Sequence, residues 1–118
     1  MGYILLLDNQ KRWAITPELL KERFQKISNH FQFLKIENIE RPYSFEFIIE
    51  DKNIEGFLHK DGDSIHLDGQ FEECLKLALD IRSDLPKNET VLFFDSSYNY
   101  NTVLEPDMSL EQLKNIFS

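Results

Sequence analysis

Residues 43–67, YSFEFIIEDKNIEGFLHKDGDSIHL, decide the fold of this chain. Three runs in this region (43–50, 53–60 and 64–68) alternate between apolar and polar side chains and are separated by turns around Asp51-Lys52 and Asp61-Gly62. A period of two is typical of strands that bury one face. The Asp-Gly pair suits a tight hairpin because such turns require positive φ. The stretch therefore predicts a three-stranded antiparallel meander.

Aligning the three strands through their turns sorts the side chains into two faces. The second turn places Phe57 opposite His66, and the first places Ile49 opposite Ile54. Both turns predict the same inward set: Tyr43, Phe45, Phe47, Ile49, Ile54, Leu58, Ile65 and Leu67. The outward set is then Ser44, Glu46, Ile48, Glu50, Glu55, Phe57, His59, Ser64, His66 and Asp68. A slip of one residue would turn the whole apolar set outward, so the agreement supports the register.

Three elements are predicted before the meander. The continuous apolar run 3–8 predicts a first strand that is covered on both faces. Thr16-Pro17 predicts a helix start, because a hydroxyl cap precedes a proline in the first turn, and the helix runs to about Ser28. A short strand follows at 32–37. The apolar stripe of the helix is Leu20, Phe24, Ile27 and Phe31.

After the meander, the sequence predicts a second helix over about 69–85 and a strand at 90–94 in the middle of the sheet. A short edge strand is expected at 102–105, and Ser109 with Gln112 forms a capping box for a last helix to Phe117. The fold class is α+β. We expect a single domain with one mainly antiparallel sheet, two longer helices on the Tyr43/Phe45/Phe47 face, and a short C-terminal helix closing an edge.

Composition narrows the functional classes. The 118 residues carry a net charge of −8 and are 42% hydrophobic, which is a globular and acidic composition. Such a charge argues against nucleic acid and anionic membrane and favours a basic partner. No run is long enough to span a membrane, and the N-terminus lacks the pattern of a signal peptide, so we expect a cytoplasmic protein. The oligomeric state, monomer or homodimer, stays open.

Each candidate for chemistry has a simpler structural explanation. His59 and His66 lie diagonally on the outward face near several aspartates and could hold zinc, but exposed strand residues explain them equally well. Cys74, the single cysteine, lies on the apolar stripe of the second helix and is expected in the core. Ser96 and Ser97 lack the glycines of a serine hydrolase, and there is no phosphate-binding loop. The sequence predicts no enzyme, no cofactor and no metal.

The outward face of the meander is the predicted binding surface. Ile48 and Phe57 lie among carboxylates, which is typical of a protein-binding patch and unusual for a solvated face. A helix or a second protomer covering this face would explain the same pattern. Tyr98 and Tyr100 add a second candidate patch in the 95–101 loop. The predicted partner-binding residues are Glu46, Ile48, Glu50, Glu55, Phe57, His59, His66, Tyr98 and Tyr100.

The C-terminal two fifths carry a resemblance. The segments FEECLKLALDIRSDLP (71–86) and VLFFDSSYNYNTVLEPDMSLEQL (91–113) resemble bacterial immunity proteins, the antidotes encoded beside contact-dependent inhibition and other polymorphic toxins. The resemblance implies a cytoplasmic inhibitor that binds the toxin domain and masks its active site or an adjacent surface. Such toxins are often nucleases with basic grooves, which an acidic antidote would fit. The group shares no functional residues that could be carried over.

Two alternatives remain at this point. One is a small ligand-binding domain or enzyme whose pocket lies under the loops 9–15 and 95–101, lined by Trp13, Asp95 and Tyr98. The other is an adaptor, a chaperone or an obligate dimer with Ile48 and Phe57 in a self-interface. Ligand-dependent thermal stabilisation and the mass in solution would distinguish them.

Overall fold

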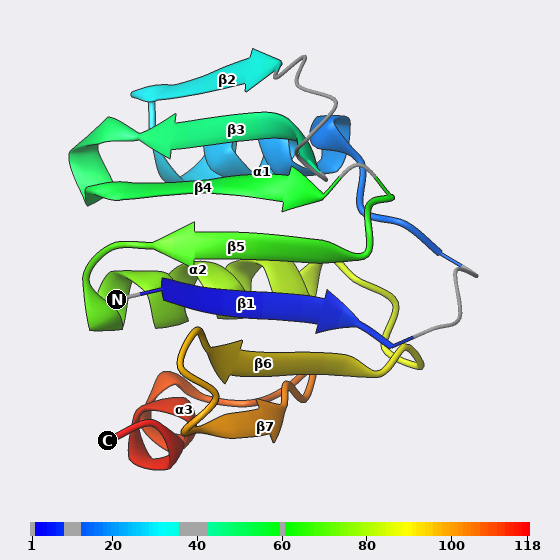
Figure 1. Cartoon of the computed structure of the whole chain (residues 1–118), viewed down its shortest axis with the longest axis vertical. Coiled ribbons are helices and arrows are strands. Elements are labelled where there is room, and N and C mark those ends of the chain that lie inside the picture. The colour runs from blue at the N-terminus through cyan, green and yellow to red at the C-terminus, as the bar shows by residue number, and fades with distance from the viewer. Residues whose placement is uncertain (1, 9–12, 36–42, 60) are drawn as a thin grey trace.

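A computed structural model of the chain describes residues 2–8, 13–35, 43–59 and 61–118. Within these residues, antiparallel strands form one seven-stranded sheet in the order β2-β3-β4-β5-β1-β6-β7 (Figure 1). The strands are β1 (Gly2–Leu7), β2 (Phe31–Lys35), β3 (Tyr43–Ile49), β4 (Ile54–His59), β5 (Ser64–Asp68), β6 (Val91–Asp95) and β7 (Asn101–Val103). The described helices are α1 (Pro17–Ile27), α2 (Phe71–Ser83) and α3 (Leu110–Ile116).

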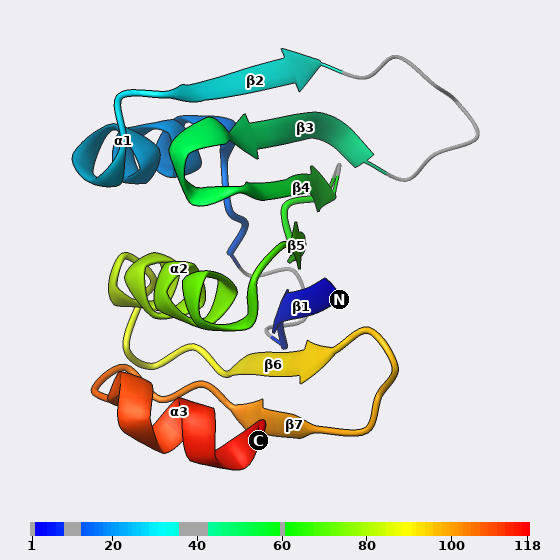
Figure 2. The same ribbon diagram turned by 90° about the vertical axis from the view of Figure 1, so that its left-hand side faces the viewer.

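The helices form a layer on one side of the sheet (Figure 2). The predicted α+β class, with one antiparallel sheet, two longer helices on one face and a short third helix, is confirmed. Thr16 caps α1 by accepting the N–H of Leu19 at 3.2 Å, and Ser109 with Gln112 forms the predicted capping box of α3. None of the described helices has the length and apolarity that a bilayer crossing requires.

The predicted register of the meander is confirmed. Strand β3 pairs with β4 so that Ile49 lies opposite Ile54, and β4 pairs with β5 so that Phe57 lies opposite His66. A bulge between Tyr43 and Phe45 interrupts the start of β3, and the side chains of Tyr43 and Ser44, like the region 36–42, lie outside the described residues. The first turn is a short 3₁₀ helix, Glu50–Lys52, and the second follows Lys60, which is not described.

The hydrophobic core lies between the sheet and the helices. Phe24 from α1 is fully buried against Phe47, with ring centroids 5.0 Å apart. The predicted inward residues of the described meander that are buried here are Phe47, Ile49, Ile54, Leu58, Ile65 and Leu67. Their burial fixes which face of the sheet the helices cover, because a shifted register would expose them.

Three details of the sequence interpretation were wrong. The described helices cover only one face of β1: Leu5 on that face is fully buried, whereas on the other face Ile4 is 8% exposed and Leu6 is half-buried. Strand β6 lies next to the edge strand β7 and not in the middle of the sheet. Phe31 begins β2 and does not continue the α1 stripe, because Ser28 is already extended, with φ −156°. The Ser28 hydroxyl ends the helix by accepting the N–H of His30 and donating to Asp51.

Two positions in the core tolerate little change. Gly56 on β4 lies opposite Phe47 on β3 and Leu67 on β5, and a Cβ built on it would lie 1.9 Å from the carbonyl oxygen of His66. Arg82 on α2 is only 2% exposed, and its guanidinium donates to backbone carbonyls of the loop after α2 and of Leu104. Gly56 thus keeps neighbouring strands of the meander close together, whereas Arg82 joins α2 to a segment 22 residues away in the sequence.

A bidentate ion pair joins the first two helices. The guanidinium of Arg23 on α1 donates from Nε to Asp84 Oδ2 and from NH2 to Asp84 Oδ1, each at 2.5 Å. This pairing holds the pKa of Asp84 below its usual range. A lowered pKa in the folded state stabilises the fold above the ordinary carboxyl pKa, and the stabilisation is lost as the pH falls through the folded pKa.

Asp84→Asn is therefore expected to cost about 1 kcal/mol of unfolding free energy near neutral pH, since both partners are partly solvated. The difference from wild type should shrink as the pH falls below about 4, the ordinary pKa of an aspartate. Urea unfolding of both proteins from pH 7 to pH 3 measures it. A difference that stays constant to pH 3 would contradict the assignment.

Candidate protein-binding site

The face of the sheet opposite the helices, here called the open face, is not covered by any element in the described part of the chain (Figure 2). A row of directly paired residues crosses its centre from β2 to β7: Leu34, Glu46, Phe57, His66, Ile4, Phe94 and Asn101. Four of these seven side chains are aliphatic or aromatic hydrocarbons, and a fifth is the imidazole of His66. The open face therefore has an apolar centre and not the polar surface typical of a solvated sheet.

Phe57 and His66 form the middle of this row. Their rings are stacked with centroids 4.2 Å apart and planes 17° apart. Burial lowers the pKa of His66, and the neighbouring His59 adds to the effect. The imidazole is thus neutral at pH 7 and behaves as a second flat ring beside Phe57. Together they present an aromatic surface from β4 and β5.

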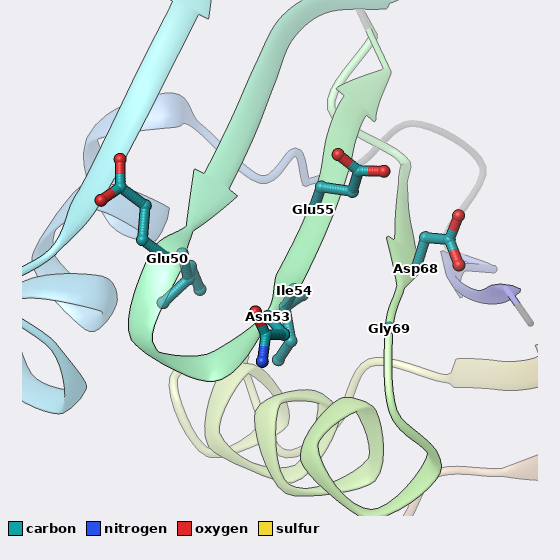
Figure 3. A pocket seen from close by; sticks show the side chains of 7 residues that line it. Glu50, Asn53, Ile54, Glu55, Asp68 and Gly69 are labelled. Carbon is teal, nitrogen blue, oxygen red and sulfur yellow. The ribbon is translucent and has the colours of Figure 1, made fainter.

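Carboxylates surround this aromatic pair on the meander side. A hollow of about 310 Å³ lies where β3 ends, β4 begins and β5 ends, and it includes Glu50, Glu55 and Asp68 among its lining residues (Figure 3). A second hollow of about 380 Å³ shares Glu55 and Asp68 and adds Glu46, Phe57 and His66. Neither lining, within the described residues, contains a lysine or an arginine. The two hollows concentrate negative potential beside an apolar centre.

The structure places the predicted residues of the meander as the sequence analysis expected. Glu46, Ile48, Glu55 and Phe57 are outward on β3 and β4. Glu50 follows β3 in the 3₁₀ turn, where Gln32 Nε2 donates to its Oε1 at 3.2 Å and links it to the open face. Glu50 is not part of a strand, but it lines the same hollow as Glu55 and Asp68.

Apart from Tyr98, the residues of the other half of the open face were missed from the sequence. Strands β1, β6 and β7 and the β6–β7 turn place an uncharged group on this face, here called the apolar half: Ile4, Leu6, Leu92, Phe94, Tyr98 and Val103. Ile4 is 8% exposed and forms the buried base of this group. Val103 is 42% exposed and Tyr98 is 72% exposed. The Tyr98 ring stacks on Phe94 with centroids 5.4 Å apart. The apolar half extends the apolar centre to the edge of the sheet.

The turn between β6 and β7 separates the two predicted tyrosines. Tyr98 adopts a left-handed conformation, with φ 61°, and turns to the open face. Tyr100 lies on the helix side, 6.1 Å from Phe117 between ring centroids. Asp95 fixes the turn, since its carboxylate accepts the Ser97 hydroxyl at 2.5 Å and the Tyr100 N–H at 2.9 Å. The expected single patch is therefore two surfaces, and only Tyr98 belongs to the open face.

The contacts and burial of His59 and Cys74 are those of structural residues. His59 Nδ1 accepts the N–H of Asp61 at 3.2 Å and lies 3.5 Å from Asp63 Oδ1. No group of three or more metal-ligating side chains converges within residues 2–8, 13–35, 43–59 and 61–118. Cys74 is fully buried, and burial raises the pKa of its thiol to about 11, so the thiolate that acts as a nucleophile is scarce at neutral pH.

The three residues predicted to line a ligand pocket, Trp13, Asp95 and Tyr98, do not come together in the described part of the chain. Asp95 lines a hollow of about 400 Å³ on the helix side, together with Tyr3 and Phe117. Tyr98 faces the opposite side of the sheet, and Trp13 packs against the core instead. Residues 9–12 of the first loop lie outside the described residues.

Comparisons of this chain with protein-family models, with curated proteins and with solved structures find no match.

Proposed function

We propose that this protein binds a basic protein partner through its open face and neutralises it by covering a functional surface. The observation that carries the proposal is the composition of that face: an apolar centre with Phe57 and His66, beside hollows lined by Glu46, Glu50, Glu55 and Asp68. Protein interfaces combine a desolvated aromatic anchor with a polar rim in this way. No chemistry by this chain is required.

The dimensions of the sheet suit such an interface. The Cα positions extend 37 × 34 Å along the two longer axes of the molecule. A stable interface covers about 800 Å² on each partner, which a face of this size can supply without a long loop or tail. The net charge of −8 would steer a basic partner toward the complex and speed association at low salt.

The resemblance to bacterial immunity proteins supports a specific partner class. We propose that the partner is a toxin domain with a basic substrate groove and that the complex forms in the cytoplasm. Masking such a groove requires negative charge beside an apolar anchor. The carboxylates on the open face lie beside Phe57 in this way. An inhibitor of this kind acts by steric and electrostatic exclusion of the substrate.

Co-expression with the domain encoded beside this chain's gene tests the proposal. The two proteins should co-elute as one complex, and cells expressing the domain should survive only when this protein is present. Absence of both binding and protection would refute the proposal.

Charge reversal on the open face is expected to slow association with that partner. Glu46→Lys combined with Glu50→Lys should lower the association rate constant about tenfold at low salt, because long-range attraction guides the encounter. The effect should shrink as salt approaches 0.5 M, and dissociation should change less. Stopped-flow or surface-plasmon measurements give both rates.

Glu22→Lys is the matched control, since Glu22 is exposed on α1 on the far side of the sheet. It changes the net charge in the same direction but leaves the open face intact. If Glu22→Lys lowers the association rate constant as much per reversed charge as the double variant does, the net charge of the protein explains the effect and the open face does not. An unchanged rate in the double variant would remove this surface as the steering one.

The apolar half of the open face favours a second candidate, self-association. It carries Phe94, Tyr98 and Val103 without a charged side chain, so two acidic copies could meet there with little repulsion. This differs from the Ile48/Phe57 self-interface expected from the sequence. Light scattering at about 100 μM distinguishes the candidates: a dimer mass that Phe94→Lys returns to the monomer assigns this half to self-association.

A further inference from the structure

A second site lies on the helix side of the sheet, away from the open face. Strand β1 begins, β6 ends, α2 begins and α3 ends at the same side of the molecule (Figure 1). A hollow of about 400 Å³ lies between these ends, lined by Tyr3, Gly69, Phe71, Asp95, Tyr100 and Phe117 among others. It is the hollow that contains Asp95, which the sequence analysis had placed in a ligand pocket.

Aromatic rings form the walls of this hollow. The Tyr3 ring lies 6.2 Å from Phe117 and 6.4 Å from Phe71, measured between centroids. The Tyr100 ring lies 6.1 Å from Phe117. The four rings come from β1, the start of α2, the β6–β7 turn and the end of the chain after α3. Aromatic faces attract cations within about 6 Å through the negative potential above the ring.

One carboxylate supplies the charge. Asp95 is 2% exposed, and the hydrogen bonds from Ser97 and Tyr100 lower its pKa, so it is ionised at neutral pH. The backbone N–H groups of Asn99 and of Asp95 itself contribute to the same lowering of the pKa. All these donors are neutral and leave the negative charge of the carboxylate in place, which favours a charged donor over a neutral one. Asp95 forms no ion pair with a lysine or arginine of the described chain. The first turn of α2 also borders the hollow, where Glu72 and Glu73 offset the positive end of the helix.

We propose that this hollow binds an organic cation of the size of an arginine or lysine side chain. The guanidinium or ammonium would lie against the Tyr100 and Phe117 rings and donate to the Asp95 carboxylate. A neutral apolar ligand would desolvate that carboxylate without compensating its charge, and an anion would be repelled by it. The cation could be a side chain of a protein or a free small molecule, since both present the same group.

Titration with model cations tests the inference without any protein partner. N-acetyl-arginine methylamide added to ¹⁵N-labelled protein should produce saturable shifts at Gly69, Asp95, Tyr100 and Phe117 amides. The citrulline analogue, which has the same shape without the charge, should produce none. Asp95→Asn should abolish saturation, whereas Asp107→Asn, an exposed aspartate before α3, should leave the dissociation constant unchanged.

A second variant covers the case in which Asp95→Asn loosens its turn. Tyr100 is 44% exposed, so Tyr100→Leu should fold normally and weaken binding of the arginine probe about threefold by removing one ring. Agmatine and a Gly-Arg-Gly peptide distinguish the sources: tighter binding of the peptide indicates a protein side chain, and tighter binding of agmatine indicates a free cation.

The inference is overturned if no cation probe gives saturable shifts, or if the citrulline analogue binds as well as the arginine probe. An unchanged dissociation constant in both Asp95→Asn and Tyr100→Leu would overturn it as well. Partner binding through the open face is measured separately, so either proposal can fail while the other stands.

Discussion

Gly56→Ala is expected to lower the unfolding free energy by about 3 kcal/mol or more, because the added methyl has no space. A Cβ at this position would lie 1.9 Å from the His66 carbonyl oxygen and 2.9 Å from Phe47 Cζ. The first neighbour is backbone of β5, so relief requires β4 and β5 to move apart. Separating them would also break the pairing of Phe57 with His66 at the centre of the open face.

Gly2→Ala is the matched control, since its Cβ would meet Ser96 Oγ at an ordinary 3.4 Å. It should change stability by less than about 0.5 kcal/mol. Urea unfolding followed by far-UV circular dichroism measures both variants. If Gly56→Ala unfolds at the wild-type urea concentration, the close contact between β4 and β5 is wrong.

Arg82→Met is expected to cost about 3–5 kcal/mol, because it removes the donors that hold several buried carbonyls together. Arg82 Nε donates to the Leu104 carbonyl at 2.8 Å, and its other nitrogens reach the Pro86 and Glu89 carbonyls at 3.2 and 3.1 Å. Methionine fills similar space but leaves these acceptors unpaired. The side chain thereby joins α2 to the loop before β6 and to the segment after β7.

Arg82→Lys distinguishes the contribution of the positive charge to stability from that of the hydrogen-bond geometry of the guanidinium. Lysine keeps the charge but offers a single ammonium in place of the planar fork, so its stability should fall between those of wild type and Arg82→Met. Lys87→Met, at an exposed position in the same loop, should be nearly neutral. Thermal unfolding of the four proteins gives the ranking, and a methionine variant as stable as wild type would show that water replaces the guanidinium.

The meander could be predicted because local signals agreed there. Alternating side chains set the inward face, and two independent turns gave one register, so Phe57 opposite His66 followed without a structure. The same alternation placed Glu46, Glu55 and Phe57 on one surface. The helix starts at Thr16 and Ser109 could also be predicted, because capping depends on residues within one turn of the helix.

The other half of the open face could not be predicted from local pattern. A strand covered on both faces and a strand with an apolar but uncovered face share one sequence pattern, so the apolar runs 3–8 and 90–94 do not distinguish the two cases. The face of β1 and β6 that no described helix covers becomes clear only when strands and helices are placed in space (Figure 2). The separation of Tyr98 from Tyr100 depends on a left-handed residue at Tyr98, a conformation that non-glycine residues seldom adopt.

The aromatic hollow around Asp95 also lay beyond sequence reasoning. Its residues come from both ends of the chain and from the middle, so no window of sequence contains them. The sequence predicts Asp95 as a pocket residue only because it begins a polar loop after an apolar strand. Its aromatic neighbours Tyr3 and Phe117 become visible only when the two chain ends meet.

The position of β1 in the sheet order has a consequence for how the chain assembles. Ile4 pairs with His66 on one side and with Phe94 on the other, so the first strand synthesised joins the two halves of the sheet. The meander can form early from neighbouring hairpins, whereas β6 attaches to it within the described sheet only through β1. Such distant pairing slows folding. During translation β1 can pair with β5 once residues 64–68 have emerged, but its other edge stays unpaired until residues 91–95 follow. A chain that lost β1 would leave the edges of β5 and β6 unpaired and open to neighbouring molecules.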